Sequence, residues 1–178
     1  MTARIRILMA LILSCLGSAA QADDQALLER ALATARVQAE RALPALDGQA
    51  YGVDLAAYQA ALRLAPFASA VWGGQTRVDL QIRSEATGSC SRYAAFVRMP
   101  PENGTVPLVL CPQFFTPGAD GLRVLTILHE MVHVVAGRDE CQAMALAARI
   151  EHLATGAFTP VDAYWAASQC DRSAYALP

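Results

Sequence analysis

Apolar residues recur at helical spacing in the first third of the chain. Residues 24–43 are rich in alanine and leucine, and Pro44 follows them. Asp54 precedes a second apolar segment that extends to about Trp72, with Pro66 as a kink or break. Because aspartate is a preferred N-cap and proline ends or bends helices, both segments predict helices.

Three segments in the middle of the chain predict strands. Polar and apolar residues alternate over 77–83, which is typical of a strand with one buried face. Residues 92–99 and 106–110 are two further strand-like segments, joined by the turn-rich run 100–104. We therefore expect a small meander of about three strands.

The longest apolar stretch, 122–136, predicts a helix that is buried on nearly every side. Gly137 fits its C-terminal cap. Two more helices are expected, one from about Asp139 to Leu153 and a shorter one from about Pro160 to Cys170. No internal repeat is visible, so the pattern as a whole predicts a single α+β domain.

Residues 1–22 have the pattern of a signal peptide. Arg4 and Arg6 precede a short apolar run, and Ala20-Gln21-Ala22 forms a small-residue cleavage site. The run is shorter than the roughly 20 residues that span a bilayer. We therefore expect export to the periplasm or the extracellular space and no transmembrane segment in the mature chain. A lipid anchor at Cys15 is the minor alternative.

The mature chain would comprise residues 23–178, with 23–73 as a helical N-terminal part or a pro-segment. Residues 76–178 would hold the sheet and the helices of the site. The chain is 54% hydrophobic, enough for one domain with a substantial core. Without Arg4 and Arg6 it has 12 basic and 16 acidic residues, a mildly acidic balance that gives no support for a nucleic-acid partner.

Four cysteines follow the expected cleavage site. An even number in an exported chain indicates two disulfides, for which three connectivities exist. We expect the pairs Cys90–Cys111 and Cys141–Cys170, because each would join neighbouring elements.

The buried helix contains His129-Glu130-Met131-Val132-His133, an HExxH motif. Histidines four positions apart share one helix face, with Cβ atoms roughly 6 Å apart, so both can bind one Zn²⁺ ion. Glu130 would hold the water on that ion and take its proton. An ionised glutamate in so apolar a helix is costly without a nearby cation, which favours a metal site over two core histidines.

A catalytic zinc ion needs a third protein ligand. A tight turn after the buried helix would bring the start of the next helix to His133, which favours Asp139 or Glu140. Glu151 and His152 would lie roughly 17–20 Å further along that helix, and we expect them on the solvated surface. Asp139 also fits an N-cap and Glu140 a first-turn acid, so spacing leaves the choice between these two open.

The segment from about Cys90 to Cys170 resembles the aspzincin metallopeptidases, the group of deuterolysin and peptidyl-lysine endopeptidase. The residues that carry this resemblance are Tyr93–Val97, Val109–Phe115, Thr126–His133, Gly137-Arg138-Asp139 and Val161–Tyr164. In that family a Gly-Thr-x-Asp-x-x-Tyr-Gly segment follows the motif, and its aspartate is the third zinc ligand. The resemblance therefore implies Asp139 as the third ligand, with Glu140 as the alternative.

The tyrosine of that family segment, which stabilises the oxyanion, is replaced here by Gln142. Gln142 or Tyr164 would then supply the oxyanion hydrogen bond. The resemblance implies a zincin-like domain and a secreted zinc metalloendopeptidase that acts on peptides or proteins. The missing tyrosine favours an alternative, a weak or inactive zinc-binding envelope protein of the same fold. A structural domain with an accidental motif is a second alternative, and a gluzincin-like site with Glu140 is a third.

Overall fold

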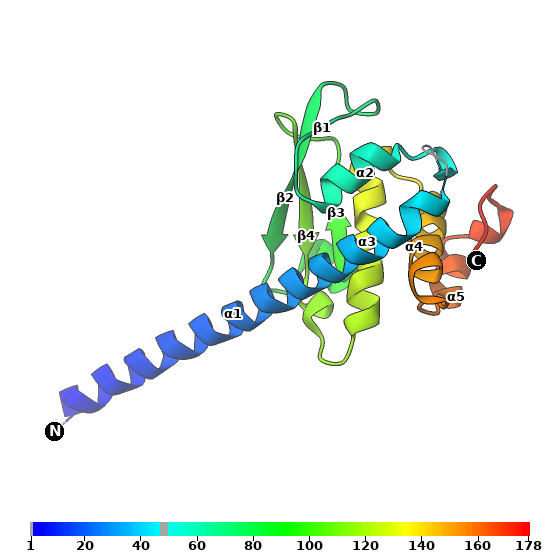
Figure 1. The fold of residues 1–178 in the computed structure, drawn as a ribbon. Helices are drawn as coiled ribbons and strands as arrows, with labels where there is room; N and C mark the ends of the chain where they lie inside the picture. Colours follow the sequence, from blue (N-terminus) through cyan, green and yellow to red (C-terminus); the bar gives the residue numbers. More distant parts are fainter. Residues whose placement is uncertain (1, 47–49) are drawn as a thin grey trace.

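The structure is a computed structural model, and it describes residues 2–46 and 50–178. Figure 1 shows a long N-terminal helix that runs past a small sheet and a group of helices. The α-helices of the described residues are α1 (Thr2–Ala42), α2 (Leu55–Leu62), α3 (Asp120–Ala136), α4 (Glu140–Thr155) and α5 (Asp162–Ala167). The strands are β1 (Phe67–Ala68), β2 (Gln75–Ile82), β3 (Ala95–Val97) and β4 (Thr105–Leu110). The domain is therefore of mixed α+β type, as the sequence predicted.

The strands form one sheet in the order β1-β2-β4-β3. β2 and β4 are parallel, whereas β1 and β3 lie antiparallel to their neighbours. The expected meander is therefore wrong. β4 is the most apolar strand, and all its residues from Val106 to Leu110 are buried. β4 lies between β2 and β3, at an inner position of the sheet, where a near-continuous apolar strand is expected.

Two predicted segments are shorter in the structure than the sequence suggested. The second helix does begin after the N-cap Asp54, but it ends at Leu62 rather than near Trp72. Leu64 adopts a positive φ of 57°, and Phe67 then pairs with Thr76 as part of β1. Likewise, the strand expected over 92–99 is limited to β3, because a 3-10 turn over Gly88–Ser91 precedes it.

The first predicted helix is part of α1, which extends back through residues 2–22. The side chains of residues 2–21, which include Cys15 and most of the expected signal peptide, lie outside the described residues. Within the described part of the chain, no helix combines the length and the apolar character that a membrane span requires.

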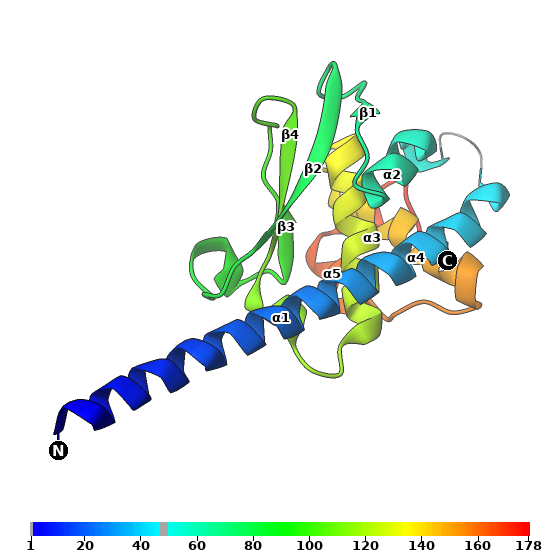
Figure 2. The same cartoon turned by 60° about the vertical axis from the view of Figure 1, so that its left-hand side comes forward.

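α3 lies at the centre of the domain. It contacts α1, α2 and α4 as well as β3 and β4, and the two views show the sheet on one side of it and α4 on the other (Figures 1 and 2). The Tyr58 hydroxyl donates to the Leu128 carbonyl oxygen at 2.9 Å, and Trp72 Nε1 donates to that of Val134 at 2.7 Å. Apolar packing on every side and these two hydrogen bonds fix the position of α3, which confirms the expected buried helix.

Both expected disulfides are present. Cys90 pairs with Cys111, which joins the 3-10 turn before β3 to the end of β4. Cys141 pairs with Cys170, which joins the first turn of α4 to the C-terminal segment. Two disulfides in a chain of this size indicate an oxidising compartment, as export would provide.

Candidate metal centre

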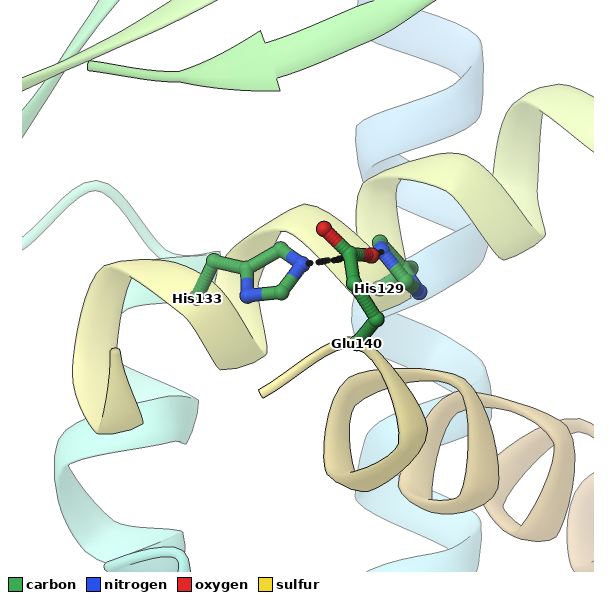
Figure 3. Close-up of side chains that lie close together, drawn as sticks. All are labelled: His129, His133 and Glu140. Carbon is green, nitrogen blue, oxygen red and sulfur yellow. Dashed lines mark hydrogen bonds and ion pairs between the residues drawn. The ribbon is translucent and has the colours of Figure 1, made fainter. Parts of the chain in front are cut away.

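His129, His133 and Glu140 converge at the bend between α3 and α4 (Figure 3). The Nε2 atoms of the two histidines are 3.0 Å apart. Glu140 Oε2 lies 3.2 Å from Nε2 of His129 and 3.3 Å from Nε2 of His133. The ligands of a tetrahedral zinc ion, bonded at about 2.0–2.2 Å, stand roughly 3.3 Å apart. These three side chains could therefore hold a metal ion.

The connection between the helices brings Glu140 to the histidines. α3 ends at Ala136, and its C-cap Gly137 has a φ of 99°, which turns the chain in a way that glycine allows and other residues resist. α4 then starts at Glu140, four residues after the last residue of α3, with Asp139 as its N-cap. The hairpin that the sequence predicted is thus present, and its second helix presents a carboxylate to His133.

Asp139 is not in the metal-binding group. Its Oδ1 accepts hydrogen bonds from the backbone amides of Cys141 and Gln142, both at 3.0 Å. A side chain that folds over the first turn of its own helix is committed to capping that helix. The structure therefore brings the alternative ligand, Glu140, to the histidines in place of Asp139.

The tautomer of His133 follows from its second nitrogen. Nδ1 lies 2.7 Å from the carbonyl oxygen of Gly137, which can only accept, so Nδ1 carries a proton. The lone pair of neutral His133 is then on Nε2, which faces Glu140 and His129. Nδ1 of His129, by contrast, is buried without a hydrogen-bond partner among the described residues. The backbone contact of His133 thus leaves its Nε2 free to bind a metal, and such contacts are common for metal-binding histidines.

Glu130 is buried next to this group, with 7% of its surface exposed. Burial raises its pKa above the ordinary value, although the charges of His129 and His133 and a backbone hydrogen bond at Val97 oppose the shift. A carboxyl group with a raised pKa beside a metal-binding cluster is suited to accept and return a proton.

Tyr164 contacts the same cluster from α5. Its hydroxyl donates to Glu140 Oε2 at 2.5 Å, and its ring meets that of His129 edge to face, with centroids 5.8 Å apart. Burial tends to raise the pKa of Glu140, but hydrogen bonds from His129, His133 and Tyr164 outweigh it and lower that pKa. Burial and the Glu140 contact raise the pKa of Tyr164, so its hydroxyl stays protonated.

The other oxyanion candidate, Gln142, lies elsewhere. Its side-chain amide donates to the Tyr51 carbonyl oxygen at 2.8 Å, and the residue does not line the cavity beside the metal group. Gln142 therefore ties α4 to the segment before α2. The structure does not support it as an oxyanion donor, since the residue is held at Tyr51 and does not line the cavity.

Glu151 and His152 lie outside the cluster, as expected, but the prediction of a solvated surface is wrong for Glu151. Only 7% of Glu151 is exposed. Its carboxylate accepts from the backbone amide of Thr159 at 2.6 Å and from the Thr159 hydroxyl at 3.0 Å. His152 is half-buried and packs near Phe158. The loop after α4 folds back over the helix, which the helical pattern could not reveal.

A cavity of about 600 Å³ opens beside the metal group. Its walls are mostly apolar and come from β3, α3, α4 and the start of α5. Residues of this wall that sequence reasoning missed include Phe96, Met99, Leu125 and Met144. They carry no motif, and only the packing of β3 and α4 against α3 brings them to the site.

No protein-family model matches this chain, and neither the curated proteins nor the solved structures contain a match. The resemblance to aspzincins therefore stays an expectation that rests on the motifs alone. The function has to be argued from the chemistry of the site.

Proposed function

We propose that the protein is an exported zinc-dependent endopeptidase in which His129, His133 and Glu140 hold the metal. The observation that carries the proposal is the convergence of these three donors beside the buried Glu130. Two imidazoles and one carboxylate are a common ligand set of catalytic zinc sites. The adjoining cavity is of a size that accommodates small ligands and peptide side chains.

A bound zinc ion would supply a Lewis acid that polarises a peptide carbonyl and acidifies water. Glu130 would act as the general base and then as the general acid. Because burial raises its pKa, it can take a proton from water and return it to the leaving nitrogen. The apolar walls of the cavity would exclude bulk water from this proton transfer.

Tyr164 would have two roles in this proposal. Its hydroxyl holds the Glu140 carboxylate in place, as partners of metal ligands do. Since its raised pKa keeps it protonated, the hydroxyl could instead turn its one hydrogen from Glu140 to an oxyanion that forms in the cavity, once Glu140 is bound to the metal. Tyr164 replaces Gln142 in this role, because Tyr164 lines the cavity and Gln142 does not.

The test is the variant Glu130→Gln. It should bind zinc in the same stoichiometry as the unaltered protein and lose about 10²–10⁴-fold in peptide cleavage. Zinc content would be measured by elemental analysis and cleavage with a mixed peptide library. Glu85→Gln, at an exposed position away from the cavity, is the matched control and should cleave normally. Retained turnover in Glu130→Gln would exclude this mechanism.

The alternative is a zinc-binding envelope protein with weak or no activity. One observation favours it: the Gln142 amide and the Tyr164 hydroxyl are both engaged within the protein. Stoichiometric zinc without cleavage of any library peptide would support this alternative. Protein purified without chelators that contains no zinc would instead indicate a structural domain with an accidental motif.

A further inference from the structure

Two arginines line the cavity beside the candidate metal centre. Arg92 follows the 3-10 turn before β3, and Arg138 lies between α3 and α4. Both are exposed, and neither forms an ion pair with any residue that the structure describes. The Arg92 guanidinium lies over the Tyr93 ring, 5.5 Å from its centroid, which limits its freedom. Two cationic groups are thus available to a ligand in the cavity.

The acidic residues of the cavity wall do not neutralise these arginines. Among the described residues, Glu130 and Glu140 are the only carboxylates that line it. Glu140 contacts both histidines, and the charges of the histidines also act on Glu130. A divalent metal ion at the centre would balance their two charges. The rest of the cavity would then be positive, although the chain as a whole has a net charge of −2. The positive charge is therefore local to the cavity.

The same wall carries exposed apolar surface. Of the six large hydrophobic residues that are exposed among the described side chains, three line this cavity: Tyr93, Leu122 and Tyr164. Large apolar side chains that cluster in an open cavity mark a binding surface rather than random exposure. A suitable ligand has apolar groups that contact this surface.

We propose that the cavity binds peptides that carry a carboxylate close to apolar residues, with Arg92 and Arg138 as the groups that recognise the carboxylate. Arginine binds carboxylates through two parallel hydrogen bonds, which favours a carboxylate over other groups of similar size. A lysine side chain would be repelled. The carboxylate can be an acidic side chain or the C-terminus of the peptide. This inference rests on the proposed function, since it specifies the substrate class of the same site.

The test measures peptide binding to the zinc-loaded Glu130→Gln protein, which should not cleave. Four fluorescent peptides would share one apolar sequence. Three have an amidated C-terminus and carry glutamate, glutamine or lysine at the same internal position. The fourth carries glutamine at that position and has a free C-terminus. Fluorescence anisotropy gives the Kd of each. We expect one or both carboxylate peptides to bind at least about fivefold more tightly than the neutral peptide, and the lysine peptide most weakly. The two carboxylate peptides identify the source of the charge.

Arg92→Gln and Arg138→Gln should each reduce the preference for the carboxylate, and the double variant should abolish it. Arg83→Gln removes an exposed arginine outside the cavity and should leave the preference unchanged. Equal affinity for all four peptides, no binding of any of them, or a preference that survives in the double variant would overturn the inference. Thermal melting of each variant shows whether it is folded.

Cleavage by the unaltered protein separates this inference from the proposed function. If neutral and acidic peptides are cleaved equally, the endopeptidase proposal stands and the carboxylate preference fails. If the zinc-loaded protein binds acidic peptides through the two arginines but cleaves none, the preference stands and the endopeptidase proposal fails.

Discussion

His133 Nδ1 lies 2.7 Å from the carbonyl oxygen of Gly137, the C-cap residue of α3. One glycine thus does two things for the candidate metal centre. Its backbone conformation turns the chain so that Glu140 reaches the histidines, and its carbonyl oxygen fixes the tautomer that leaves the His133 Nε2 lone pair free. The geometry of the site therefore depends on a residue that provides no side chain.

The variant Gly137→Ala should weaken zinc binding. At φ 99° and ψ −148° a side chain costs about 1–3 kcal/mol of strain. An added Cβ would approach only Val71, at 3.9 Å, so the cost is conformational rather than steric. We expect relaxation of this turn to move the carbonyl oxygen from His133 and to lower zinc affinity about 10–100-fold, measured by chelator competition.

The matched control is Gly156→Ala, at the C-cap of α4. Gly156 also has a positive φ, 83°, and no atom of the described residues lies within 4 Å of an added Cβ. This variant should lose about 1–2 kcal/mol of stability and keep its zinc affinity. Equal zinc affinities in the two variants would show that the Gly137 contact does not position His133.

The third ligand can be identified by comparing Glu140→Ala with Asp139→Ala. Glu140→Ala should lower zinc affinity by more than about 100-fold, because loss of a ligand exceeds the usual effect of losing a ligand's partner. Asp139→Ala should cost about 1 kcal/mol of stability through the lost N-cap and change zinc affinity little. Urea denaturation and chelator competition give the two quantities. The reverse order of zinc affinities would restore Asp139 as the ligand.

Zinc should stabilise the protein more as the pH rises. Burial lowers the pKa of His133, but Glu140 and Glu130 outweigh this effect and raise it above 6.5 in the metal-free protein. The contribution of protonated His133 to stability is therefore present below pH 6.5 and is lost as the pH rises through the higher folded value. The lowered pKa of Glu140 gives a contribution that is present above pH 4.5 and is lost only as the pH falls through the lower folded value.

Zinc binding requires the deprotonated histidine, so zinc stabilises the protein more as the pH rises. The ion pair of protonated His133 with Glu140 in the metal-free protein has the opposite pH dependence. The difference in Tm between zinc-loaded and chelator-treated protein should increase as the pH rises past 6.5, because the raised pKa of His133 places the loss of its proton above that pH. Thermal melts in matched buffers test this expectation. A difference that is constant or decreases with pH would mean that His133 does not bind the metal.

Glu151→Ala should destabilise the fold without affecting the metal. The carboxylate holds the Thr159 amide and hydroxyl, and charged hydrogen bonds of this kind contribute about 1.5–3 kcal/mol. The loop that it anchors precedes Val161 and Tyr164, so peptide binding should also weaken. His152→Ala, at the neighbouring half-buried position, should have a smaller effect on both. An unchanged free energy of unfolding in Glu151→Ala would show that the hydrogen bonds of Glu151 to Thr159 do not stabilise the fold.

The candidate site could be predicted from the sequence only in part. Residues four apart on an apolar helix must share a face, so the pairing of His129 with His133 needed no tertiary information. The choice between Asp139 and Glu140 required the tertiary structure, because the side chains of adjacent residues at a helix start differ by about 100° in direction. The resemblance to aspzincins implied Asp139, whereas in this chain that side chain caps α4.

The sequence by itself determined the local features of this protein. These are the buried helix with its HExxH motif, the cap at Gly137 and the helix start at Asp139, which follow from short-range stereochemistry. The count of cysteines indicated two disulfides but left three connectivities open, and the structure selects the expected pairs. Only the tertiary structure decided the order of the strands, the burial of Glu151 and the joining of Arg92, Arg138 and Tyr164 around one cavity. Those features depend on contacts between segments far apart in the chain, and the periodicity of each segment carries no information about its partner.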